Sequence, residues 1–297
     1  MGQQNTRTPI RLVPSFPSPS LGEGVLLAIT PQDCELMPHV PDHNQVVREE
    51  FTRQAVAYAA NPSIADPERI ARLVQAVSPS ADARVLEVAT GPGYVAMGFA
   101  AVAREVVGID LTEAPLAIAE QRRQEQGLHN VRFQLADASR LPFADGEFDV
   151  VICRLAFHHF AVPPQMLSEM VRVCTPHGTV AVEDIVVSEH PARGAYQNRF
   201  ENLRDPSHTA AFSLSALLGL FAEAGLELEH VSTGHLHQVV KRWMANAQTP
   251  AERATEVRRL IEHDAREDLS GTQPYQTHEG QWCFTQHTAI VVGRKLG

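Results

Sequence analysis

Residues 85–96 read VLEVATGPGYVA, an apolar strand that contains Glu87 and leads into a loop built on Gly91 and Gly93. The loop satisfies the G-x-G-x-x-G/A pattern with which many folds hold the pyrophosphate of a dinucleotide. Glu87 would repel a pyrophosphate, because two like charges a few ångströms apart cost about 4 kcal/mol at an effective dielectric near 20. The stretch therefore favours a ligand that is cationic near Glu87.

Strand-like apolar segments alternate with helical segments after this loop. Because β-α-β repetition builds a parallel sheet covered by helices on both faces, the pattern predicts an α/β, doubly wound, Rossmann-like fold. Ligands of such sheets bind at the carboxyl ends of the strands. The expected strands are residues 84–89, 106–110, 131–135, 148–153 and 178–184, and the expected helices are residues 94–103, 113–126 and 165–174.

Residues 235–283 form an insertion between the last two expected strands. Thr249 and Glu252 have the spacing of a capping box and precede an apolar helical stripe. We expect the insertion to cover the substrate as a cap, and an additional structural helix pair is the alternative. The neighbouring elements are expected as a helix at residues 213–224 and strands at residues 226–231 and 288–294.

The composition of the chain changes near residue 37. Residues 1–37 are rich in proline and lack periodicity, which is typical of a disordered tail. Residues 38–297 are expected to form the main domain, and residues 38–78 its N-terminal helices. One of these helices is signalled by Asp66 as N-cap and Pro67 in the first turn.

The composition restricts the class of ligand and the cellular compartment. The chain has 297 residues, 44% of them hydrophobic, and a formal net charge of −10, which disfavours a nucleic-acid partner. No apolar run approaches the length that would span a membrane. The cysteines lack the spacing of a metal site, and we expect a reduced, cytoplasmic setting. They are Cys34, Cys153, Cys174 and Cys283.

Carboxylates end three successive strands of the expected sheet. S-adenosylmethionine carries a sulfonium, an ammonium, a ribose diol and an adenine, but no phosphate. Glu87 supplies negative charge and orders the loop, and the two loop glycines let the backbone approach the methionine part. Asp110 can accept both ribose hydroxyls, and Asp137 can accept from the adenine amino group. Leu111 and Ala138 are expected as apolar walls. A dinucleotide remains the alternative, since Asp110 also has about the spacing of a ribose-binding acid in that fingerprint.

The chain resembles the class I S-adenosylmethionine-dependent methyltransferases, in the methyltransferase type 11 branch that includes ubiquinone/menaquinone biosynthesis enzymes. The resemblance covers residues 43–295 and rests on VLEVATGPGYVA, VVGID, LADASRLPFADGEFDVVICRLAFHHF and VRVCTPHGTVAVED. It implies a seven-stranded sheet, mostly parallel with an antiparallel last strand, and S-adenosylmethionine as cofactor. Ala89 replaces the usual first glycine. Arg154 is expected to join the cofactor-binding residues.

The stretch RLAFHHF places His158 and His159 just after the fourth strand. In small-molecule methyltransferases that this chain resembles, such a histidine pair and an acid after the fifth strand, here Asp184, line the substrate side. A histidine can remove a proton from a methyl acceptor near neutral pH. The alternative is that one histidine packs and the other binds loop backbone. Phe157 is expected as an apolar wall, and His208 either faces the substrate or caps a helix.

These features together predict an enzyme that transfers a methyl group from S-adenosylmethionine to a carbon or oxygen of a small molecule. A quinone, a phenol, a polyketide and a glycoside are all compatible acceptors. An NAD-dependent oxidoreductase and a non-catalytic S-adenosylmethionine-binding protein are the alternatives. The sequence leaves open the acceptor and the oligomeric state.

Overall fold

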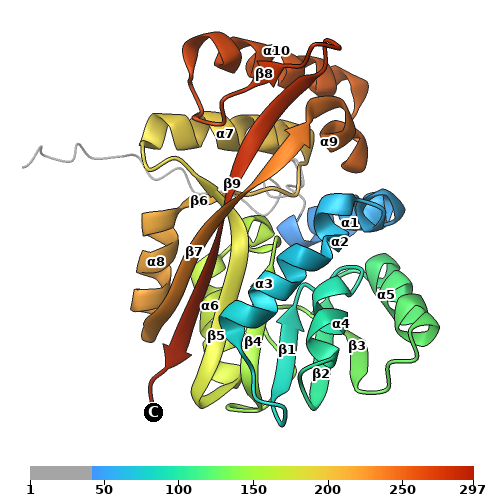
Figure 1. The fold of residues 1–297 in the computed structure, drawn as a ribbon, viewed down its shortest axis with the longest axis vertical. Helices are drawn as coiled ribbons and strands as arrows, with labels where there is room; N and C mark the ends of the chain where they lie inside the picture. Colours follow the sequence, from blue (N-terminus) through green and yellow to red (C-terminus); the bar gives the residue numbers. More distant parts are fainter. Residues whose placement is uncertain (1–41) are drawn as a thin grey trace, which may run out of the picture. The chain divides into compact units, whose positions relative to one another are not determined.

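A computed structural model describes residues 42–297, and the expected tail at residues 1–37 lies outside the described residues (Figure 1). The domain begins with three helices, α1 (His43–Ala59), α2 (Pro62–Ala65) and α3 (Pro67–Val77). The predicted N-cap is confirmed, because the Asp66 side chain accepts hydrogen bonds from the backbone of Glu68 and Arg69.

The central sheet has seven main strands in the order β3-β2-β1-β4-β5-β9-β7. All neighbours pair in parallel except around β9, which is antiparallel to both β5 and β7. This confirms the predicted α/β fold with an antiparallel last strand. The strands are β1 (Arg84–Val88), β2 (Glu105–Asp110), β3 (Val131–Leu135), β4 (Phe148–Arg154), β5 (Cys174–Val187), β7 (Leu226–Val239) and β9 (Trp282–Lys295). Two short strands, β6 (Phe212–Ser213) and β8 (Tyr275–Gln276), pair with β5 and β9.

Helices cover both faces of the sheet, and each face carries its own apolar core. Val85 and Leu86 are neighbours on β1 yet belong to different clusters of buried residues, because successive side chains of a strand point to opposite faces. The strand order reverses between β1 and β4, which is where sheets of this kind open a ligand crevice. The helices after β1, β2, β4 and β6 are α4 (Tyr94–Ala100), α5 (Glu113–Glu125), α6 (Pro163–Val173) and α8 (Leu214–Glu223), with a 3₁₀ turn, η1 (Phe157–His159), before α6.

A second group of elements gathers around the far ends of β7 and β9 (Figure 1). Its helices are α7 (Pro191–Arg204), which we did not predict, α9 (Val240–Asn246) and α10 (Ala251–Glu267). They share a core of buried side chains that includes Phe200, Trp243 and Phe284. Because β7 and β9 extend into residues 235–283, the inserted segment between the strands is shorter than predicted.

The predicted capping box at the start of α10 is wrong. Pro250 is the N-cap residue and makes no side-chain hydrogen bond. The Thr249 hydroxyl instead donates to the backbone carbonyl oxygens of Arg204 at 2.9 Å and Met244 at 3.1 Å. Thr249 therefore ties the end of α7 to α9. Within residues 42–297, no helix has the length and apolar character required to cross a membrane.

Candidate functional site

The glycine loop joins β1 to α4 and is held by Glu87. The Glu87 carboxylate is 2% exposed. It accepts from the Thr90 hydroxyl at 2.5 Å and from the backbone N–H of Ala96, in the first turn of α4, at 2.8 Å. Burial raises the pKa of Glu87 to about 7, against the lowering effect of these two hydrogen bonds. Glu87 thus orders the loop, and its carboxyl group beneath the loop is only partly ionised near pH 7.

The two loop glycines have different surroundings. Gly91 has a φ of +52° and lies under the ring of Tyr58, which a Cβ atom would approach to 3.7 Å. Gly93 has a φ of +80°, and a Cβ atom there would lie 2.7 Å from Phe133 and 2.9 Å from Ala119. Gly91 lines the cavities described below, whereas Gly93 lies outside them. Gly93 therefore packs closely at the start of α4, and its contact with the cofactor stays a prediction.

A cavity opens at the carboxyl ends of β1, β2 and β3, and we call it the edge cavity. The Asp110 carboxylate accepts from the backbone N–H groups of Gly91 at 2.8 Å and Thr112 at 2.9 Å. Burial raises the pKa of Asp110 to about 6, although these backbone hydrogen bonds oppose the shift. The lining includes four residues that the sequence singled out together, Asp110, Leu111, Asp137 and Ala138.

Helix α1 closes the other side of the edge cavity. The Asn44 side-chain amide donates to Asp137 at 2.9 Å, and Asp137 also accepts from the backbone of Ser139 at 2.8 Å. His43 Nε2 lies 2.7 Å from the carbonyl oxygen of His159. The start of α1 is therefore tied both to the carboxylate after β3 and to the turn after β4.

A smaller cavity lies beside the glycine loop, and we call it the loop cavity. It is lined by Glu87, Gly91 and Arg154 among others. Arg154 Nε donates to Glu183 at 2.9 Å, and Nη1 donates to the carbonyl of Ile64 at 3.0 Å. No acceptor within residues 42–297 takes a hydrogen bond from Nη2 of Arg154. This buried cation thus has donor capacity left for an anionic group.

A third cavity, which we call the polar chamber, lies between α1, η1, α7 and the far parts of β7 and β9. His158 lines it and pairs with Asp184 twice, through Nδ1 to Oδ1 at 2.6 Å and through its backbone N–H to Oδ2 at 2.9 Å. A carboxylate can only accept, so in the neutral ring Nδ1 carries the proton and Nε2 keeps a lone pair. Burial alone would lower the pKa of His158, but the charge and hydrogen bond of Asp184 raise it above its usual value.

His159 lines both the edge cavity and the polar chamber but has a different partner. Ser207 Oγ donates to Asp205 Oδ1 at 2.5 Å and lies 3.0 Å from His159 Nδ1. Because the hydroxyl proton goes to Asp205, His159 Nδ1 must donate to Ser207. Burial and the neighbouring His158 lower the pKa of His159 to about 3. His159 is therefore a neutral group near pH 7.

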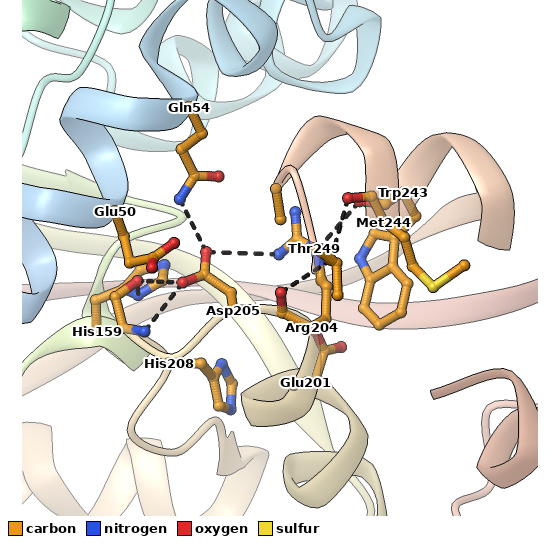
Figure 2. Close-up of polar contacts among 12 residues, drawn as sticks. Glu50, Gln54, His159, Glu201, Arg204, Asp205, His208, Trp243, Met244 and Thr249 are labelled. Carbon is orange, nitrogen blue, oxygen red and sulfur yellow. Dashed lines mark hydrogen bonds and ion pairs between the residues drawn. The ribbon is translucent and has the colours of Figure 1, made fainter. Parts of the chain in front are cut away.

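Two predicted substrate residues lie behind the chamber instead of lining it. Phe157 is 1% exposed and packs against Phe160 and Phe212 in the core, while Phe160 itself lines the edge cavity. His208 stands 5.2 Å from His158 between ring centroids, and its Nε2 lies 2.8 Å from Asn198 Oδ1. Figure 2 shows the His208 ring apart from the hydrogen bonds of the Asp205 carboxylate.

The sequence reasoning missed the helical contribution to the site. Tyr58 lines all three cavities, so it marks the point where they meet. A stripe along α1 faces them at spacings of three and four residues, and its two amide side chains were the missed signal. The stripe consists of Asn44, Val47, Phe51, Gln54 and Tyr58. Other missed lining residues are Glu201 and Arg204 on α7, Gln238 on β7 and Gln286 on β9.

The comparison with known families agrees with this geometry. A family model described as a methyltransferase domain matches residues 79–248. The chain belongs to the methyltransferase family. Methyltransferase YcgJ of Bacillus subtilis, described as uncharacterized, is 30% identical over 217 residues, which is 73% of this chain and 86% of YcgJ. Membership makes this chain an S-adenosylmethionine-dependent methyltransferase and replaces the oxidoreductase alternative.

Two further comparisons extend the family relationship. The solved structure of YcgJ superposes with a TM-score of 0.73 at 28% identity, covering 77% of this chain and 99% of that one. A demethylmenaquinone methyltransferase of Thermus thermophilus is 39% identical over 127 residues, or 42% of this chain and 56% of that protein. A geranyl diphosphate methyltransferase solved in complex with S-adenosylmethionine shares the methyltransferase fold, with a TM-score of 0.57 at 13% identity, covering 78% of this chain and 86% of that one.

Proposed function

We propose that the edge and loop cavities together bind S-adenosylmethionine and that the polar chamber holds a small-molecule acceptor. The observation that carries the proposal is the meeting of the three cavities at Tyr58. A cofactor in the first two cavities would thereby open onto the pair formed by His158 and Asp184. When bound, S-adenosylmethionine supplies an electrophilic methyl group.

The residues present fit this cofactor. Arg154, with its free Nη2, can bind the methionine carboxylate, and Glu87 offsets the positive charge of the ammonium and sulfonium. Asp110 keeps lone pairs for the ribose hydroxyls beside its two backbone contacts. Asp137 would accept from the adenine amino group, with Leu111 and Ala138 as walls. Gly91 allows the close approach of the methionine part.

His158 is the base in this proposal. Its Nε2 lone pair takes the proton of an acceptor hydroxyl or of an acidic carbon, and Asp184 stabilises the imidazolium that results. His159 stays neutral and lines the passage between the cavities. The remaining contribution is alignment and exclusion of water, which can supply up to about 7–11 kcal/mol of the barrier.

Helix α9 of the inserted segment completes the chamber as a cap, and α10 packs behind it. Trp243 on α9 lines the polar chamber, and its ring packs against Phe200 and Phe284. Acceptor selectivity is then set by α7, α9 and the ends of β7 and β9, whereas the methyl donor is held by the other half of the sheet.

The setting that we propose is the cytoplasm, with no nucleic-acid partner. The three cysteines within residues 42–297 are buried and free, namely Cys153, Cys174 and Cys283. Burial raises the pKa of Cys174 to about 12, so this thiol does not serve as a nucleophile near neutral pH. The net charge of −10 opposes binding to a phosphate backbone.

Calorimetry with S-adenosylmethionine, followed by incubation of labelled cofactor with quinones, phenols, polyketides and glycosides, tests the proposal. We expect cofactor binding and label transfer to at least one acceptor. The Asp184→Asn variant should lose most of the label transfer but keep most of its affinity for the cofactor. Absence of cofactor binding would refute the assignment of the cavities. Binding without transfer to any acceptor would favour a non-catalytic S-adenosylmethionine-binding protein.

A further inference from the structure

The polar chamber contains buried groups that the methyl-transfer chemistry does not use. Seven polar residues that line it are at most 8% exposed. Besides the two histidines, they are Gln54, Glu201, Asp205, Gln238 and Gln286. Buried polar groups without partners are costly, so their free atoms indicate what a ligand must supply.

Gln54 presents a fixed acceptor. Its Nε2 donates to Asp205 at 3.1 Å, and the reversed amide would place two oxygens against each other, so the orientation is determined. Figure 2 shows the Gln54 oxygen directed away from Asp205. No donor within the described residues reaches this oxygen, although the side chain is 1% exposed. A ligand N–H or O–H group would satisfy it.

A chain of amides on the opposite wall ends at another acceptor. Gln238 Nε2 donates to Gln286 Oε1 at 2.7 Å, and Gln286 Nε2 donates to Glu201 Oε1 at 2.5 Å. The chain of donors thus runs from Gln238 through Gln286 and ends at the Glu201 carboxylate. Burial raises the pKa of Glu201, although Arg204 and Gln286 oppose the shift. Additional donors from a ligand would further stabilise the ionised form.

The cation at the chamber wall is already engaged. Arg204 Nε donates to the carbonyl of Trp243 at 3.2 Å, and its guanidinium lies over the Trp243 ring at 5.0 Å. Arg204 Nη1 is also 4.0 Å from Asp205. The Trp243 ring contacts Phe200 and Phe284 edge-on as well. Arg204 therefore already lies over the Trp243 ring, which leaves less of that ring for stacking of a flat quinone.

We propose that the polar chamber selects a compact methyl acceptor that carries several hydrogen-bond donors, such as the hydroxyl or amino groups of a sugar ring, over a flat quinone. The inference rests on the proposed function, because it assumes that the chamber is the acceptor side. The recognition atoms are Gln54 Oε1, the Glu201 carboxylate and Gln238 Oε1. His158, the proposed base, lines the same chamber.

Saturation-transfer NMR on the full chain, saturated with S-adenosylhomocysteine, tests this selectivity. The probes are methyl glucoside, the corresponding methyl glucosaminide and menadione, each at millimolar concentration. We expect binding of at least one of the two sugar probes and no comparable binding of menadione. The difference between the two sugars tells whether hydroxyl or amino groups are preferred. Binding of menadione alone, or of none of the three, would overturn the proposal.

Two variants and a control tie the selectivity to the named atoms. Gln54→Met and Gln238→Met each remove an amide at nearly constant volume, and each should weaken sugar binding about tenfold, as expected for one buried hydrogen bond. Gln75→Met, on the exposed side of α3 outside the chamber, should change nothing. Unaltered sugar binding in both chamber variants would refute the assignment of these atoms.

The same samples separate this inference from the proposed function. S-adenosylhomocysteine affinity, measured by calorimetry, should be the same in the wild type and in all three variants. If the wild type does not bind S-adenosylhomocysteine, the proposed cofactor site itself is refuted. Retained affinity without sugar binding would refute the acceptor class alone.

Discussion

His158 and His159 are neighbours in sequence but have opposite electrostatic surroundings. His158 donates to the Asp184 carboxylate, which favours its protonated form. His159 donates to a serine hydroxyl and borders His158, which favours its neutral form. Within one backbone turn, η1, a group that can accept and hold a proton thus lies next to one that stays uncharged.

We expect His158→Ala to lower turnover by about 10²–10⁴-fold, the usual contribution of a general base. Because the pKa of His158 is raised, the wild-type rate should rise with pH through a region above the ordinary histidine value. This limb should disappear in His158→Ala and persist in His159→Ala. Turnover numbers between pH 5 and 9 provide the measurement, and a limb that persists in His158→Ala would contradict the assignment.

Asp110 is expected to contribute to cofactor binding through charge-assisted hydrogen bonds, each worth about 1.5–3 kcal/mol. Asp110→Ala should therefore weaken S-adenosylmethionine binding by at least tenfold in calorimetry. Asp145→Asn is a matched control, since the Asp145 side chain is 81% exposed and pairs with Arg172 away from the cavities. Equal affinities of the two variants would refute the role of Asp110.

At the scale of elements, helix α1 connects the two halves of the site. Asn44 reaches the carboxylate after β3, while Gln54 reaches Asp205 after α7. Asp205 accepts hydrogen bonds from Gln54 and Ser207. Although burial raises its pKa, the charge of His159, which is protonated only in the acid range, and the charge of Arg204 lower the pKa of Asp205 below the usual range. The hydrogen bonds of α1 to both sides of the crevice come from side chains and can open without disrupting the sheet.

We expect cofactor binding to order α1. Amide hydrogen exchange of α1 (His43–Ala59) should slow on addition of S-adenosylhomocysteine, because a ligand in the edge cavity adds contacts to its stripe. Helix α8 (Leu214–Glu223) lines none of the three cavities and should exchange at the same rate with and without ligand. Unchanged exchange in α1 would contradict its proposed place over the cofactor.

Sequence patterns predicted those elements whose burial follows a regular period. Strands β1, β2, β4 and β5 are rich in apolar residues and mostly buried, so their positions could be read to within a few residues. The outer part of β7 was missed, because its residues are mostly polar and leave no apolar run. Helix α7 was missed because it buries Gln197 and Glu201, polar residues that hide its inward face.

The site was predictable where topology alone determines it. Acids that follow neighbouring parallel strands must meet at one edge, which brought Asp110 and Asp137 together in the edge cavity. The contributions of α1 and α7 depend on how those helices pack across the sheet, and no spacing within the sequence encodes that packing. Phe157 and His208 have the expected chemistry, but their side chains point into the protein behind the chamber.

For the whole molecule, buried ionisable groups couple folding to pH in two opposite ways. His159 has a folded pKa of about 3 against an ordinary value of 6.5, so its contribution to stability is lost as the pH falls below 6.5. Glu87 has a folded pKa of about 7 against an ordinary 4.5, so the folded state binds more protons between these values. Glu87 therefore lowers the free energy of unfolding as the pH rises through that range.

A cationic cofactor should reverse the cost of ionising Glu87 and Asp110. We expect S-adenosylmethionine to bind more tightly at pH 7.5 than at pH 5.5 and to release protons in the lower part of this range, where both carboxyls are partly protonated in the free protein. At a ligand concentration of 100 times Kd, binding stabilises the fold by about 2.7 kcal/mol, which corresponds to a Tm increase of roughly 5–10 °C. Thermal denaturation at fixed ligand concentration should show the larger increase at pH 7.5. Calorimetry in two buffers of different ionisation enthalpy measures the released protons directly. The electrostatic role of the two carboxylates would be contradicted by proton uptake on binding or by a smaller Tm increase at pH 7.5.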